Sequence, residues 1–285
     1  MGKQGADRFG GRQTMKTIAE LYKARFGLDK DIGTDMKAEG TVADILNRRS
    51  IRRYTDDPVS DDLLDVLLAC AQSAPAKSDL QQYSIIVVTD PKSREVIGDW
   101  EGKAPVFLMF CADIRRIRKL AEIRGHDYQN DNVDTFMNGC VDAALAMQSF
   151  IIAAESVGLG CCPISGVRNR IELMCELLGL PDGVFPICGL TVGWPSVPGF
   201  ISMRQPPANV VHRDKYDDTN LEQETDAYDR RRHDVYAIPP EKQRHTDKYG
   251  ALDFCGWSEN VTRQLSLPER AGFKAFLNSH GFKLD

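Results

Sequence analysis

The sequence predicts an α+β protein of the α/β type, with one central mixed sheet flanked by helices. Short runs rich in β-branched and apolar residues at 84–89 and 106–111, each bounded by proline or aspartate, indicate buried strands. A long apolar stretch at 134–157 indicates a helix, and further strands are indicated at 160–165 and 184–193. Because strands alternate with helices along the chain, we expect one sheet covered by helices.

Local signals mark the helix boundaries. Apolar residues recur at helical spacing in 14–27, and Gly27 supplies a C-cap. Ser60 is a suitable N-cap, the aspartates after it favour the positive end of the helix dipole, and Pro75 marks the end of that helix. Further helices are expected at 42–46, 169–178 and about 258–278.

Length and composition restrict the class of protein. The 285 residues are 42% hydrophobic and 27% charged, which suits a globular chain with a sizeable core. A formal net charge of −5 gives no global attraction to nucleic acid or to an anionic membrane. No apolar run approaches the ~20 residues of a membrane-spanning helix, and the polar N-terminus lacks the apolar core of a secretory signal. We therefore expect a cytoplasmic protein without a nucleic-acid or membrane partner.

The eight cysteines lie mostly inside apolar stretches. None forms a C-x-x-C pair, and no histidine stands at ligand spacing from another, so we expect no metal site. We interpret the cysteines as buried, reduced thiols. The adjacent pair Cys161 and Cys162 is interpreted as packing, because a disulfide between neighbours strains the backbone.

The composition changes at about residue 196, after which Pro, Arg and Asp dominate through 250. This composition indicates an extended segment that wraps around another part of the molecule or a second subunit. It does not indicate an independently folded core. We predict an N-terminal tail and helix (1–40, disordered at 1–13), a core (41–195) and a C-terminal excursion with a closing helix (196–285). The helix at 134–157 is apolar on most sides and needs a core or a second subunit around it, so we expect a homodimer.

The segment after residue 47 is the most informative. Four arginines stand within the six residues 48–53, in a chain that is acidic overall. A guanidinium offers several N–H donors in a planar fork that suits phosphate oxygens, and two or three of them neutralise a phosphomonoester. A solvated basic loop is the alternative interpretation of such a run.

Six strings follow one another along the chain: R-R-S-I-R-R-Y (48–54), P-V-S (58–60), A-P-A-K-S-D-L-Q (74–81), A-A-E-S-V-G-L-G (153–160), P-I-S-G (163–166) and L-T-V-G-W-P (190–195). In this order and spacing the chain resembles nitroreductase-family flavoproteins over about 41–280. The branch it most resembles contains the larger, NADPH-preferring oxygen-insensitive nitroreductases and related flavin reductases. These also end in a W-S-E-type helix, here Trp257-Ser258-Glu259 followed by Arg263. The resemblance implies a nitroreductase-like fold, an FMN cofactor and an intertwined homodimer with the flavin at the subunit boundary.

The resemblance also implies a role for individual residues. The ribityl phosphate of FMN would be held by Arg48, Arg49, Ser50 and Arg52, together with Arg204. Ser78 and Gln81 would contact the ribityl chain or the ring edge. The segment facing the ring would be Pro163, Ile164, Ser165 and Gly166, with the last two offering backbone N–H groups near flavin N5 and O4. Such donors stabilise negative charge on the reduced ring.

Four positions depart from the family pattern. A loop hydroxyl is replaced by Ala76, the asparagine by Asp79, the first of two glycines by Ser165, and a lysine by Ser202. An acid at position 79 would disfavour an anionic reduced ring and lower the flavin potential.

The implied activity is hydride transfer from NADPH or NADH through FMN to small electron-poor acceptors such as nitroaromatics and quinones, by a ping-pong mechanism. The cofactor carries the chemistry, so no catalytic side chain is expected. Discrimination for NADPH needs arginines that reach its 2′-phosphate. The resembling branch places such contacts in the excursion, where Arg232 and Arg244 are the candidates and a solvated helix face is the alternative.

Two other functions stay open at this stage. An FMN protein of the same fold could serve as a flavin reductase, dehydrogenase or dehalogenase, because the acceptor pocket falls in the variable region 113–135. A flavin-binding or nucleotide-binding module without turnover is the second. A dinucleotide-binding domain is disfavoured, because no G-x-G-x-x-G follows a strand.

Overall fold

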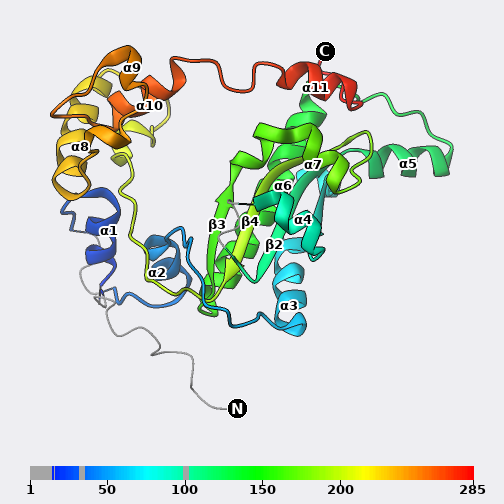
Figure 1. The fold of residues 1–285 in the computed structure, drawn as a ribbon, viewed down its shortest axis with the longest axis horizontal. Helices are drawn as coiled ribbons and strands as arrows, with labels where there is room; N and C mark the ends of the chain where they lie inside the picture. Colours follow the sequence, from blue (N-terminus) through cyan, green and yellow to red (C-terminus); the bar gives the residue numbers. More distant parts are fainter. Residues whose placement is uncertain (1–14, 16, 32–35, 99–102) are drawn as a thin grey trace. The chain divides into compact units, whose positions relative to one another are not determined.

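The computed structural model describes residues 15, 17–31, 36–98 and 103–285. The chain divides into two compact units. The described part of the sheet unit comprises Arg48–Phe200 and Arg270–Asp285, and the arm unit comprises the described residues of Gln13–Asn47 with Ile201–Glu269 (Figure 1). The predicted tail at 1–13 lies outside the described residues, and the predicted boundaries at 41 and 196 stay predictions.

The sheet unit is built on four strands. These are β1 (Tyr83–Val87), β2 (Val106–Asp113), β3 (Gly160–Ile164) and β4 (Val184–Gly193), in the order β1-β2-β4-β3. All three strand pairings are antiparallel. The α+β class is therefore confirmed. The predicted mixed sheet is wrong for the four described strands, because each runs antiparallel to its neighbours in the sheet. An isolated parallel bridge joins Ser50, which lies outside these strands, to Cys161 of β3.

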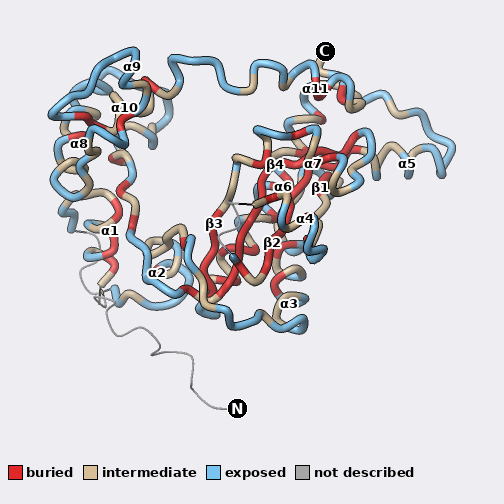
Figure 2. Tube along the Cα trace, in the orientation of Figure 1, coloured by how far each residue is buried: buried red, intermediate tan, exposed pale blue. Residues whose placement is uncertain are grey.

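Helices cover both faces of this sheet. On one face, α3 (Asp61–Gln72) and α6 (Val133–Ser156) enclose a core that includes Phe110 and Phe150. On the other face, α4 (Pro91–Ile97), η3 (Ser165–Arg170) and α7 (Ile171–Leu177) enclose a second core around Phe107. Because β2 lies between the two cores, all eight of its residues are buried, which explains its unbroken apolar run (Figure 2).

Helix α6 turns small side chains toward the sheet. Ala143 and Ala146 are fully buried there, whereas Met137, Val141 and Leu145 are exposed on the opposite side. Within one chain, the helix is therefore buried on one side only. Its 24 residues would also satisfy the length and composition of a membrane span. In this structure the helix packs against the sheet as a core element.

Several predicted boundaries are confirmed. Helix α1 (Ile18–Phe26) ends at Gly27 in the left-handed conformation, and its start has a capping box between Thr17 and Glu20. The Ser60 side chain caps α3 by accepting from the backbone N–H of Leu63. The short helix expected at 42–46 is α2 (Gly40–Asn47).

The predicted single helix at 258–278 is wrong. The chain forms α10 (Trp257–Leu265) and α11 (Phe273–Ser279) instead. Pro268 lies between them, and a proline lacks the N–H that a continuous helix needs. Helix α11 belongs to the sheet unit, where its Phe276 joins a third core around Phe185.

Sequence reasoning missed several further elements. In the sheet unit these are α4, η1 (Lys77–Asp79) and α5 (Arg115–Arg124). In the arm unit they are η4 (Pro207–Asn209), α8 (Leu221–Val235), η5 (Pro240–Lys242) and α9 (Thr246–Tyr249). Most are short or strongly polar, so they lack the apolar periodicity on which a helix prediction rests.

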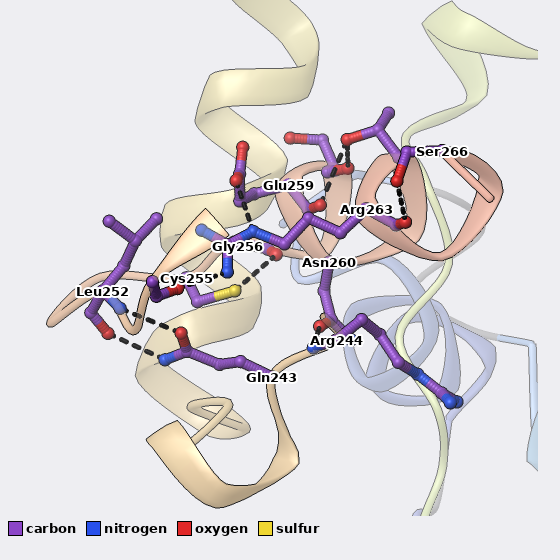
Figure 3. A network of polar contacts seen from close by, with 12 residues as sticks. Gln243, Arg244, Leu252, Cys255, Gly256, Glu259, Asn260, Arg263 and Ser266 are labelled. Atoms are coloured by element: carbon purple, nitrogen blue, oxygen red, sulfur yellow. Dashed lines mark hydrogen bonds and ion pairs between the residues drawn. The ribbon is translucent and has the colours of Figure 1, made fainter. Parts of the chain in front are cut away.

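Polar contacts hold the loops of the arm unit. Buried Gln243 exchanges two hydrogen bonds with the backbone of Leu252, and buried Arg263 pairs with Glu259 and donates to the Gly250 carbonyl (Figure 3). Buried Asp229 accepts from the backbone N–H of Ser258 at the start of α10. These bonds give an irregular, loop-rich segment a defined conformation without a sheet of its own.

Candidate functional site

The arginine segment runs alongside β3, and backbone hydrogen bonds set its register. Ser50 bridges to Cys161, and the Ile51 N–H donates to the Cys161 carbonyl at 3.0 Å. Ile51 is buried, with 5% of its surface exposed, whereas Arg52 is exposed. Extended backbone sends successive side chains to opposite sides. The buried isoleucine therefore turns the neighbouring arginine outward.

Glycine at position 160 permits this close approach. A Cβ atom added to Gly160 would lie 2.6 Å from the Ile51 side chain. Ile51 also approaches Gly199, where the added Cβ would lie 3.0 Å from Ile51 Cδ1. Gly160 thus has a packing role, since it leaves room for Ile51, the residue that separates the arginine pairs 48–49 and 52–53.

The arginine side chains gather at β3. Arg48 Nε lies 3.6 Å from Glu155 Oε1 of α6, and both side chains are largely buried. Burial raises the pKa of the Cys162 thiol, while the Arg52 and Arg48 guanidiniums lower it and Arg52 hydrogen-bonds to it. Arg49 Nη1 donates to the Pro198 carbonyl at 3.5 Å. Arg48 and Arg52 therefore both act electrostatically on Cys162 of β3.

The cysteines are free thiols, as predicted. Cys70 and Cys140 are half-buried and the other six are buried. Burial raises the pKa of Cys140 to about 11 and that of Cys175 to about 12, which keeps both thiols protonated near neutral pH. The adjacent cysteines 161 and 162 are both buried, which agrees with their interpretation as packing.

The loop at 76–82 has an unusual backbone. Ser78, Asp79 and Gln81 have φ values of 50°, 59° and 52°, in the left-handed region that glycine usually occupies. The left-handed form costs roughly 1–2 kcal/mol for each such residue. Strain of this kind clusters at ligand-binding segments. All three side chains are exposed, and Gln81 Nε2 donates to Asp79 Oδ1 at 3.0 Å.

The predicted ring-facing segment lies where β3 ends and η3 begins. Pro163 and Ile164 are the last residues of β3, and Ser165 and Gly166 are the first of η3. Helix η3 has no side-chain N-cap. Backbone N–H groups in the first turn of a helix have no partner within it, so this turn presents donors.

Two predicted arginines line a cavity within the arm unit. Its volume is about 570 Å³, and its lining includes Phe26, Met203, Arg204, Tyr228, Arg232 and Trp257. Burial raises the pKa of the Tyr228 hydroxyl, and the nearby charges of Arg232 and Arg204 lower that pKa. Arg204 thus lies in the arm unit, and its predicted part in phosphate binding stays a prediction.

Arg244 lies apart from this lining. Its side chain is exposed and points away from the polar network drawn in Figure 3. Its backbone N–H donates to Asn260 Oδ1 at 2.8 Å. The two arginines predicted to select NADPH therefore have different surroundings.

Sequence reasoning missed the contacts of two carboxylates on α6. Glu155 stood inside a matching string, but its pairing with Arg48 was not foreseen. Asp142 accepts hydrogen bonds from the backbone of the 76–82 loop. A lone aspartate inside an otherwise apolar run was the available signal, because a buried charge needs partners.

Comparison with known proteins places the chain in a family. Two family profiles match: "Nitroreductase family" over residues 45–107 and 95–194, and "Nitroreductase family, C-terminal domain" over 202–285. The chain is 34% identical over 252 residues to "FMN reductase (NADPH)" of Bacillus subtilis, a match that covers 85% of this chain and 98% of the relative. It is 33% identical over 248 residues to "Oxygen-insensitive NADPH nitroreductase" of Salmonella typhimurium, with 85% and 98% covered.

Solved structures agree with the sequence matches. NfrA1 nitroreductase from B. subtilis superposes with a TM-score of 0.77 at 33% identity, covering 85% of this chain and 99% of the other. The Vibrio harveyi NADPH:FMN oxidoreductase complexed with NAD⁺ superposes with a TM-score of 0.73 at 31% identity, covering 85% of this chain and 97% of the other. The protein is an α+β protein of the nitroreductase fold, and the chain belongs to the nitroreductase family. The predicted resemblance and fold class are confirmed.

The seating of Ile51 leads to a first prediction. We expect Gly160→Ala to lower the affinity of the protein for FMN at least tenfold, because the new Cβ displaces Ile51 and the arginines on either side of it. Flavin-fluorescence titration of the flavin-free protein measures the change. Gly272→Ala is the matched control, since nothing lies within 4 Å of its added Cβ. Equal FMN affinity in Gly160→Ala and native protein would show that the arginines do not depend on this contact.

Proposed function

We propose that this protein is an FMN-dependent oxidoreductase that takes hydride from NADPH or NADH and reduces small electron-poor acceptors such as nitroaromatics and quinones. The observation that carries the proposal is the register of the arginine segment (48–53) against β3, set at Ser50 and Ile51, in a chain with a net charge of −5. Membership of a family whose relatives are named as FMN reductases and NADPH nitroreductases supports it. The protein is an NAD(P)H-dependent flavin oxidoreductase, and FMN is its cofactor.

The donors at β3 suit the phosphate of FMN. Arg48, Arg49 and Arg52 offer guanidinium forks, and Ser50 adds a hydroxyl. Glu155 offsets part of the charge of Arg48 and holds its side chain in place. Enough positive charge is left for a phosphomonoester with close to two negative charges. We assign the phosphate to these four residues.

The remaining proposed contacts surround the ribityl chain and the ring. Ser78 and Gln81 project from the left-handed loop, and Pro163 with Ile164 leads into η3. The backbone N–H groups of Ser165 and Gly166 would stabilise negative charge on the reduced ring. The flavin supplies hydride acceptance and donation when bound, so the protein contributes binding, orientation and electrostatics. We assign no catalytic side chain.

A ping-pong mechanism leads to a second prediction, because donor and acceptor use one ring face in turn. The yellow protein should bleach anaerobically with NADPH alone and recover its colour when a nitroarene or quinone is added. Stopped-flow absorbance measures the two half-reactions, and steady-state double-reciprocal plots should be parallel. Bleaching that requires the acceptor to be present would contradict the mechanism. A protein that stays yellow with both nicotinamides would be a flavin-binding module without turnover.

We propose that Arg232, with Arg244, recognises the 2′-phosphate of NADPH. Arg232 lines a cavity whose aromatic side chains and volume of about 570 Å³ suit a nucleoside. Arg232→Ala should lower kcat/KM for NADPH about tenfold while leaving that for NADH within twofold, and Arg244→Ala should have a smaller effect. Arg230→Ala is the matched control, because this exposed arginine on the same helix pairs with Asp226. An unchanged NADPH-to-NADH ratio in both test variants would remove the assignment.

We also propose that the protein forms a homodimer. Met137, Val141 and Leu145 form an exposed apolar stripe on α6, at 53%, 47% and 38% exposure, on the side of the helix that faces away from the sheet. Residues four apart share one helix face, so the stripe is continuous and suits a self-complementary interface. The resemblance to a family of intertwined dimers supports the same arrangement, with the C-terminal excursion wrapping the partner.

The stripe leads to a fourth prediction. Val141→Asp should convert the dimer to a monomer at micromolar concentration, because a charge would be buried without a partner. Sedimentation velocity of native and variant protein measures the state. A native protein that sediments as a monomer at this concentration would contradict the proposal.

We place the protein in the cytoplasm. Its eight free thiols suit a reducing compartment, where disulfides are rare.

Supply of reduced flavin and reductive dehalogenation use the same donor half-reaction. A screen of acceptors against the pre-reduced enzyme separates them from nitro and quinone reduction.

A further inference from the structure

One buried carboxylate holds both ends of the left-handed loop. Asp142 of α6 is only 1% exposed. Its Oδ1 accepts from the Lys77 N–H at 3.0 Å, and its Oδ2 accepts from the Gln82 N–H at 2.9 Å. Both oxygens of a single side chain are therefore used by the two backbone positions that bracket the strained residues.

Besides Asp142, the loop has local backbone hydrogen bonds from Asp79 to Ala76 and from Tyr83 to Gln81, and one from the Asp113 N–H of β2 to the Gln82 carbonyl at 2.9 Å. Its residues 77, 78, 79 and 81 are exposed, so they contribute no buried apolar anchor. Within the loop, the Leu80 N–H donates to the Lys77 carbonyl at 3.0 Å, which closes one turn. Three left-handed residues without glycine are unfavourable in a free chain. Hydrogen bonds from backbone N–H groups to an ionised carboxylate are stronger than those to a neutral acceptor, so Asp142 offsets the strain.

The path of α6 is adapted to this contact. Gly139 lies one helical turn before Asp142, and a Cβ added there would meet Ala112 Cβ at 3.1 Å and the Gln82 carbonyl oxygen at 3.3 Å. The helix therefore approaches the end of the loop more closely than a larger residue would allow. Ala143, fully buried beside Asp142, continues this close packing.

We propose that Asp142 is a positioning residue for the flavin site, which holds the 77–82 segment in the conformation that presents Ser78 and Gln81. The inference rests on the proposed placement of the ribityl chain and ring at those two side chains. Asp142 acts through the loop and touches neither the flavin nor the acceptor. It explains why a helix that is otherwise apolar at its centre keeps a buried carboxylate.

The test compares native protein with Asp142→Asn. Asparagine keeps the shape but offers one acceptor oxygen and one donor amide, so one of the two backbone N–H groups meets a donor. We expect hydrogen exchange at the Lys77 or Gln82 amide to quicken at least tenfold, with exchange at Phe110 of β2 unchanged. We expect the Kd for FMN and for riboflavin to rise by the same factor, about tenfold, because the loop contacts the part that both flavins share.

Asp134→Asn is the matched control. This exposed carboxylate lies near the start of the same helix and accepts from the Asn138 side chain, away from the 77–82 segment. Its flavin affinities and loop exchange should equal those of native protein. Should Asp142→Asn fail to fold, Gly139→Ala provides the second variant, because it leaves the carboxylate intact and pushes the helix away from Gln82.

Three outcomes would overturn the proposal. Unchanged Kd values for both flavins in folded Asp142→Asn would remove the positioning role and leave the proposed function intact. A loss confined to FMN, with riboflavin unaffected, would place the effect at the phosphate and contradict the role of the loop. Native protein that takes up neither flavin would overturn the proposed function and this inference together.

Discussion

The hydrogen bond between the Ile51 N–H and the Cys161 carbonyl sets the register of the arginine segment (48–53) on β3. It fixes the segment after α2 against β3, buries Ile51 against Gly160 and leaves Arg52 at the surface. The other end of the segment is held as well, because the Ser196 N–H donates to the Arg53 carbonyl at 3.0 Å and the Thr55 N–H donates to the Trp194 carbonyl at 2.8 Å. These contacts hold the segment along β3, where Arg48 and Arg52 both act on the Cys162 thiol. A concentration of donors in the sequence becomes a binding site because the sheet supplies the register.

Helix α6 connects this site to the rest of the fold. Its apolar side chains pack the sheet, while its two buried or half-buried carboxylates hold separate polar segments. Glu155 contacts Arg48, and Asp142 holds the left-handed loop roughly 20 Å away along the helix axis. Each carboxylate contacts partially or fully charged donors, a guanidinium for Glu155 and two backbone N–H groups for Asp142, and these contacts offset the cost of burying its charge. The same helix exposes an apolar stripe that we assign to a second subunit.

Much of this arrangement is predictable from the sequence. The strands, Ser60 as a cap and Gly27 as a terminator follow from local chemistry, and the arginine segment follows from its unusual density of donors. The left-handed loop is not predictable, because Ser78, Asp79 and Gln81 replace the glycine that would have marked it. Asp142 is visible as a charge in an apolar run, but its partners are distant in sequence. The arm unit combines segments from both ends of the chain, which no local pattern reveals.

FMN binding depends most directly on the contact between the arginine segment and the phosphate. The decisive measurement is the Kd of flavin-free native protein and of Arg52→Ala for FMN and for riboflavin, which lacks the phosphate. We predict that native protein prefers FMN at least a hundredfold, and that Arg52→Ala loses most of this preference with its riboflavin affinity unchanged. Equal affinity of native protein for the two flavins would contradict the account.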